Sequence, residues 1–154
     1  MEKIQKILVV SRSTLECRKA LHYGITLAKQ FDAELYVLQT FYNVFGLKGW
    51  NLPIHGQMVR EGFEKMQTDT KVEIRRMIEQ AKENDLKVEV LLREGKFIDE
   101  VSKVVEEEKI DLMVLASHSA WRLEHFLFGR DNEDALRKLP CSVLFVKDDP
   151  EPLE

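Results

Sequence analysis

Short apolar segments alternate with longer amphipathic segments along most of this chain. The apolar runs are nearly continuous and rich in Val, Ile and Leu, which is typical of strands buried on both faces of a sheet. A strand with one exposed face would instead alternate apolar and polar positions. The pattern predicts five such strands, over residues 6–11, 34–39, 87–92, 110–116 and 142–146.

Between the strands, apolar residues recur three and four positions apart, which predicts helices. Ser13 followed by Glu16 forms a capping-box pattern at the start of the first one. The order of strands and helices predicts an α/β fold, an open five-stranded parallel sheet with helices on both faces. Such a sheet binds ligands at the carboxyl ends of its strands. The predicted helices cover residues 13–30, 59–84, 97–108 and 130–139.

One stretch, Phe41 to Gly56, interrupts the alternation. It contains several glycines and a proline, so it is predicted to be a long loop. Its large side chains (Phe41, Tyr42, Phe45 and Trp50) are costly to leave in water. Two interpretations stay open: the loop closes over the ligand cleft, or the segment Phe41–Trp50 contacts a protein partner.

Length and charge narrow the class of protein. The 154 residues fit a single domain over 1–147, followed by a polar tail over 148–154. A net charge of −4 gives no electrostatic reason to expect nucleic acid as a partner. No apolar run approaches the roughly 20 residues that a membrane helix needs, and the amino-terminal residues lack a signal-peptide pattern. We therefore expect a cytoplasmic protein with no membrane partner.

Few residues suggest catalysis or metal binding. Cys17 and Cys141 lack metal or redox spacing, and the histidines lack the spacing of metal ligands, so no metal site is expected. Ser117 and His118 lie together, but the nucleophile-elbow pattern is absent and no orienting acid is evident. No catalytic residue is predicted. A further expectation is that the acidic side chains of the 97–108 helix are solvated; these are Glu100, Glu106, Glu107 and Glu108.

Two segments resemble the universal stress protein family. The turn Glu94-Gly95-Lys96 opens a helix, after which an acidic stretch and Asp111 lead into a strand that ends in Ala-Ser-His-Ser. The last segment also fits the family, with Gly129 before the final helix and a Cys-x-Val-Leu run in the last strand. The resemblance extends over essentially the whole chain, including the capped helix after the first strand. The resemblance implies the Rossmann-like fold that this family shares with adenine nucleotide alpha hydrolases, and a non-enzymatic role in the stress response.

The resemblance also identifies a nucleotide loop, and here the chain departs from the family. ATP-binding members carry Gly-x-x-Gly, nine residues, then Gly and Ser or Thr, so that backbone N–H groups approach the phosphates at a helix N-terminus. The matching positions here hold Ala116, Ser119, Gly129 and Arg130. Arg12 replaces an Asp that contacts the nucleoside in binding members. Carboxylates just after Arg130 would also repel a triphosphate.

The expected function is therefore a stress-response binding or signalling module that does not bind ATP in the family manner. No cofactor is expected, although ATP or AMP stays possible. The alternative is a nucleotide- or anion-binding switch in which Arg12 and Arg130 replace the lost glycine contacts with charge. The candidate nucleotide or anion site consists of Ser11, Arg12, Thr40, Ala116, Ser117, His118, Ser119, Gly129 and Arg130.

The resemblance further implies a homodimer that forms through the last strand. An unpaired apolar edge strand supplies the physical reason, because its free backbone groups can pair with those of a second copy. The predicted dimer edge is Val143, Leu144, Phe145 and Val146.

Overall fold

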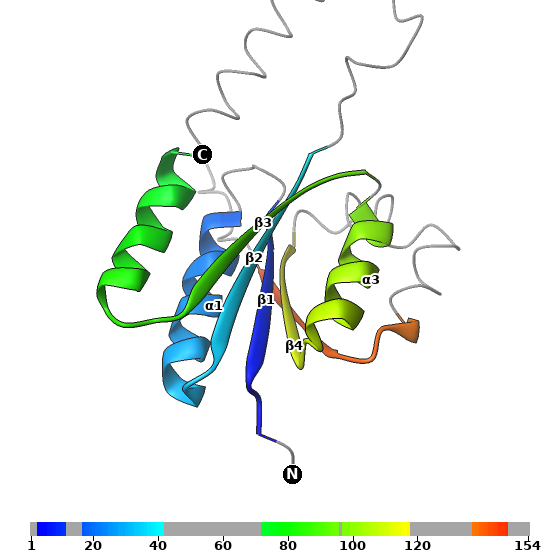
Figure 1. Ribbon diagram of the computed structural model, residues 1–154, viewed down its shortest axis with the longest axis horizontal. Coiled ribbons are helices and arrows are strands. Elements are labelled where there is room, and N and C mark those ends of the chain that lie inside the picture. Colours follow the sequence, from blue (N-terminus) through cyan, green and yellow to red (C-terminus); the bar gives the residue numbers. More distant parts are fainter. Residues whose placement is uncertain (1–2, 12–16, 42–71, 96, 118–136, 148–154) are drawn as a thin grey trace, which may run out of the picture.

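A five-stranded parallel sheet forms the centre of the computed structural model, which describes residues 3–11, 17–41, 72–95, 97–117 and 137–147 (Figure 1). The strand order is β3-β2-β1-β4-β5, and all four pairings are parallel. The predicted fold class is confirmed. The strands are β1 (Lys6–Ser11), β2 (Glu34–Phe41), β3 (Val88–Glu94), β4 (Leu112–Ser117) and β5 (Ser142–Lys147).

Helices cover both faces of this sheet. α1 (Cys17–Phe31) and the helix over residues 72–83 lie on one face, and α3 (Phe97–Glu108) lies on the other (Figure 1). The first face buries Val9, Leu35 and Val37 against Ala20 and Ile74, among others. The second face buries Leu8, Val10, Leu38 and Met113 against α3. Alternate residues of each strand thus enter different halves of the core, which explains why the strands are apolar at consecutive positions.

Two strands continue two residues beyond their predicted ends. β2 and β3 continue to Phe41 and Glu94 because they pair with each other there, Thr40 opposite Arg93 and Phe41 opposite Glu94. β4 begins later than predicted, at Leu112, because Ile110 and Asp111 form hydrogen bonds outside the β4 ladder. The amide of Ile110 closes the end of α3 by donating to the carbonyl of Val105.

Asp111 joins the start of β4 to the start of β1. Its Oδ2 accepts hydrogen bonds from the backbone N–H groups of Gln5, at 2.8 Å, and Lys6, at 2.9 Å. Its own N–H donates to the carbonyl of Lys6 at 3.0 Å. The acidic residue that leads into this strand therefore fixes the register of the two central strands at their amino-terminal ends.

The ends of α1, of the helix over residues 72–83 and of α3 share one geometry. Asp32, Asp85 and Lys109 each adopt a left-handed conformation, with φ between 52° and 63°. The next residue in each case donates its N–H to the carbonyl five positions earlier, as in a Schellman motif. These residues are Ala33, Leu86 and Ile110, all apolar, and Ala33 and Ile110 are buried. Each of these helices thereby ends in a turn that leads to the start of the next strand.

Candidate functional site

The carboxyl ends of β1 and β4 lie side by side at the topological switch point of the sheet. The chain runs from β1 to β2 and β3 on one side, then crosses to β4 and β5 on the other. Val10 pairs with Leu115, so Ser11 and Ala116 follow at neighbouring strand ends. Ligands bind at such a point in open α/β sheets because the loops diverge there and leave a crevice.

Four of the nine predicted site residues are described, and the topology brings them to this one edge. Ser11 and Ala116 end the central pair, Ser117 follows Ala116, and Thr40 lies near the end of β2, one strand away. The remaining five lie outside the described residues; they are Arg12, His118, Ser119, Gly129 and Arg130. The capping pair that begins with Ser13 and the aromatic segment after Phe41 also lie outside them.

Ala116 stands where the family loop has its first glycine, and its methyl group is half-buried. It packs against the core cluster on the α1 face. The Ala116 methyl group is therefore in contact with the core at the end of β4.

Glu100 departs from the sequence prediction. It was expected to be solvated with the other acids of this helix, but it is only 8% exposed, whereas Glu106 and Glu107 are exposed. Its side chain folds over Gly95, where a Cβ would approach Glu100 Oε1 to 3.1 Å. Lys103 pairs with the carboxylate at 3.0 Å. The signal in the sequence was the glycine, which has φ +150° and leaves the space that Glu100 fills.

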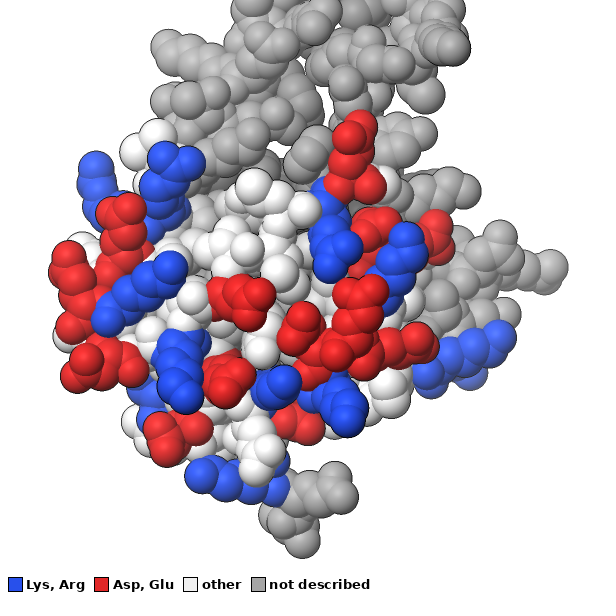
Figure 2. All heavy atoms as spheres, viewed as in Figure 1, with Lys and Arg blue, Asp and Glu red and all other residues white. Residues whose placement is uncertain are grey.

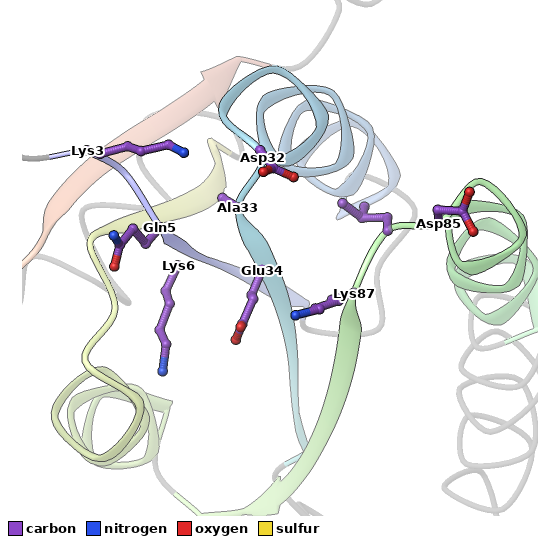
Figure 3. Close-up of a pocket in the computed structure, with 9 residues that line it drawn as sticks. Lys3, Gln5, Lys6, Asp32, Ala33, Glu34, Asp85 and Lys87 are labelled. Atoms are coloured by element: carbon purple, nitrogen blue, oxygen red, sulfur yellow. The ribbon is translucent and has the colours of Figure 1, made fainter.

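A polar cavity lies at the opposite edge of the sheet, among the amino-terminal ends of β1, β2 and β3 (Figure 3). Its volume is about 330 Å³. Figure 3 shows Lys6, Glu34 and Lys87 directed into the same space. Three lysines and three carboxylates line it, so their formal charges cancel and the cavity has no net attraction for an anion. The lining residues are Lys3, Gln5, Lys6, Asp32, Ala33, Glu34, Asp85, Leu86 and Lys87.

Contacts within the chain already engage the polar groups beside this cavity. Lys6 Nζ donates to the carbonyl of Glu108 at 2.9 Å and lies 5.6 Å from the centre of the Tyr36 ring. The Tyr36 hydroxyl donates to Glu34 at 3.1 Å. Burial, with the neighbouring carboxylate of Glu34 second, raises the pKa of Tyr36 to about 12. These interactions indicate a structural network and not a binding site.

The described residues offer few reactive groups. Burial raises the pKa of the Cys141 thiol, with a smaller contribution from Asp111, so the thiol stays protonated and weakly nucleophilic. Within the described ranges, no three His, Cys, Asp or Glu side chains are grouped so that they could hold a metal ion. None of the helices among these residues is long and apolar enough to cross a membrane.

β5 lies at one edge of the sheet, as the dimer prediction requires. Phe145 is 40% exposed, and Val143 and Leu144 are half-buried. Val146, however, is only 4% exposed and packs into the α1-face core. The side chains available to a partner at this edge are therefore the first three of the predicted four.

Comparisons with known proteins agree on one family. The model of the universal stress protein family matches residues 3–147. The chain is 27% identical over 145 residues to universal stress protein MJ0531 of Methanocaldococcus jannaschii, a match covering 93% of this chain and 82% of that one.

Two solved structures share the fold at low identity. A universal stress protein in complex with cAMP is 19% identical, with a TM-score of 0.62 over 94% of this chain and 98% of that one. A family protein from Arabidopsis thaliana with AMP bound is 14% identical, with a TM-score of 0.60 over 96% and 97% of the two chains.

Proposed function

The chain belongs to the universal stress protein family, and from this premise we propose that it is a non-enzymatic binding module of the stress response that does not hold ATP in the family manner. The observation that carries the proposal is the switch point. It joins the ends of β1 and β4, where the loop that would hold a triphosphate begins at Ala116. Two of the loop's three glycines and its hydroxyl are replaced.

The replaced residues act on the phosphates of a ligand rather than on the cleft as a whole. Backbone N–H groups hold a phosphate only where no side chain intervenes, so Ser119 in place of glycine restricts the approach. Arg130 stands where a hydroxyl would meet the phosphate, and Asp131, Glu133 and Asp134 follow it. Carboxylates at that position repel a highly charged ligand more than a singly charged one.

Nucleotide binding with fewer phosphates is the second candidate function. It is supported by the printed descriptions of two fold relatives, one in complex with cAMP and one with AMP. In this version Arg12 and Arg130 supply positive charge to a single phosphate group. Because the Ala116 methyl packs into the core, the strand end itself does not oppose such a ligand.

Native mass spectrometry of freshly purified protein separates the two candidates. A mass that matches the bare chain supports the binding module, whereas co-purified AMP, cAMP or another monophosphate supports the switch. Replacing both Arg12 and Arg130 with Gln should abolish retention of a monophosphate if these side chains hold it. Retention that survives this double change would argue against the switch.

We further propose that the module is cytoplasmic and forms a homodimer through β5. The exposed ring of Phe145 and the half-buried side chains of Val143 and Leu144 give this edge an apolar surface. Leu144→Lys places a charge in the pairing, so light scattering should report a lower mass than for the wild type. A wild-type chain that is already monomeric at high concentration would exclude the β5 dimer.

A further inference from the structure

β3 is the edge strand on the side of the sheet away from β5, and its outer side is unpaired among the described residues. β3 pairs with β2 along its whole length, and its other side faces outward at the front of the view in Figure 1. Two large apolar side chains are exposed on this strand, Val90 at 39% and Leu92 at 63%. In the same view, Figure 2 shows an uncharged area in front of this edge with acidic and basic side chains to either side. Exposed apolar groups beside free backbone groups are typical of a strand that pairs with another chain.

The residue order of β3 is complementary to itself when read in the opposite direction. Placing a second copy antiparallel with Leu91 opposite Leu91 sets Glu89 opposite Arg93 and Val90 opposite Leu92, each twice. Glu89 and Arg93 lie on the α3 face, whereas Val90 and Leu92 lie on the α1 face, since alternate residues point to opposite sides. Every exposed side chain of the middle of the strand thereby meets a partner of matching chemistry.

Neighbouring registers lack this match. A two-fold axis perpendicular to the sheet keeps like faces together, so alternative registers are centred on the adjacent residues of the strand. Centring on Val90 sets Lys87 opposite Arg93, two like charges. Centring on Leu92 sets Arg93 opposite Leu91, so the pairing of Glu89 with Arg93 is lost. The arrangement centred on Leu91 is the one that pairs opposite charges and apolar groups together.

We propose that β3 is a second association edge, at which a second copy of this chain pairs antiparallel about Leu91. Arg93 also forms an ion pair with Glu107 of its own chain at 3.3 Å, which holds its guanidinium on the α3 face beside the edge. Because β3 and β5 lie at opposite edges, pairing at one leaves the other free. Chains that used both would assemble beyond a dimer by extending one continuous sheet.

Cysteine cross-linking tests the register directly. In a Cys17→Ser, Cys141→Ser background, Glu89→Cys and Arg93→Cys are made as separate proteins, one carrying a mass tag. Directly opposite residues of an antiparallel pair lie about 4.5–5.5 Å apart at Cα, within disulfide range. Position 89 is displaced from its own copy by four residues, or roughly 13 Å, which is out of range.

Under mild oxidation, an equimolar mixture should give a cross-linked heterodimer, while each variant alone should stay uncross-linked. The absence of a heterodimer, or homodimers in equal yield, would overturn the proposal. Both variants must show the thermal unfolding of their background before they are compared.

Charge reversal tests the chemistry of the edge. In a Leu144→Lys background, which removes β5 pairing, analytical ultracentrifugation should still detect a weak dimer. Glu89→Arg or Arg93→Glu alone should weaken it about tenfold or more, because like charges then face each other twice. The double change should restore association, and Glu107→Gln, which removes only the partner within the chain, should leave it intact. A monomeric background protein, or a double variant that is no better than the singles, would refute β3 pairing.

Discussion

Gly24→Ala isolates the closest contact between a helix and the sheet. Gly24 is buried in α1, and a Cβ built there would overlap Cγ2 of Val9 and approach Cδ1 of Leu35 to 3.5 Å. Val9 is 0% exposed and lies between Val37 and Val114 in the sheet, so it has no free space to move into. The alanine must therefore push α1 away from β1 or force Val9 out of its preferred rotamer.

Two opposing effects set the magnitude. Overpacking a full core costs roughly 1–3 kcal/mol, whereas replacing glycine with alanine inside a helix gains about 0.8–1 kcal/mol from helix propensity. The net result should be a loss of about 1 kcal/mol in the free energy of unfolding. Urea unfolding followed by far-ultraviolet circular dichroism measures it, with an unchanged m value showing that the same surface is exposed.

Val9→Ala supplies the control, because it removes the methyl groups that the new Cβ would strike. In that background Gly24→Ala should stabilise the protein by about 1 kcal/mol, since only the propensity gain remains. The effect of the same substitution thus changes sign, a coupling of about 2 kcal/mol between adjacent residues. If Gly24→Ala stabilises the wild type and the Val9→Ala background equally, the close contact between α1 and β1 is wrong.

Two further predictions concern the amino-terminal edge. Asp111→Ala removes two charge-assisted hydrogen bonds to the amides of Gln5 and Lys6. It should lower the free energy of unfolding, measured in urea, by roughly 1–3 kcal/mol. Asp111→Asn should cause a smaller loss, and equal losses would contradict the assigned role of the carboxylate. The raised pKa of Tyr36 favours the folded state fully below pH 10, and this stability is lost as the pH rises through about 12. At most about 2–3 kcal/mol is involved, so Tyr36→Phe should flatten the fall in stability above pH 10, and an unchanged pH profile would count against the burial of the hydroxyl.

The fold was predictable because alternate residues of the same strands are buried in the two halves of the core. That arrangement makes each strand continuously apolar, as in Ile7 to Val10, and this is a strong local signal. The helix α1 was predicted from apolar residues that recur three and four positions apart, and Ala20, Leu21 and Ala28 among them are buried. The ends of β2 and β3 were missed because pairing between Thr40 and Arg93 depends on two distant segments.

Some features of the edges could not be derived from local patterns. The predicted helix ends at residues 30, 84 and 108 fall within one residue of the observed ends. The left-handed conformations of Asp32, Asp85 and Lys109 were not predicted, because these positions lack the glycine that usually marks such a cap. Glu100 was assigned to solvent because an acidic helix usually faces water, whereas its burial depends on the space left by Gly95. The juxtaposition of Ser11 and Ala116 follows from the strand order, which the residue pattern does not specify.

The candidate site was found by resemblance at its two strand ends rather than by chemistry. No residue type among Ser11, Thr40, Ala116 and Ser117 indicates a binding site by itself. They form a candidate site because they lie together at the carboxyl ends of adjacent strands.

Isothermal titration calorimetry with Mg-ATP and AMP tests the proposed function most directly. The departures at Arg12, Ser119 and Arg130 predict that Mg-ATP binds no more tightly than about millimolar. The combined change Ala116→Gly, Ser119→Gly, Arg130→Ser and Arg12→Asp should tighten ATP binding if the rest of the cleft is intact. Micromolar affinity of the wild-type chain for Mg-ATP would contradict the proposal that the family's nucleotide loop is no longer functional here.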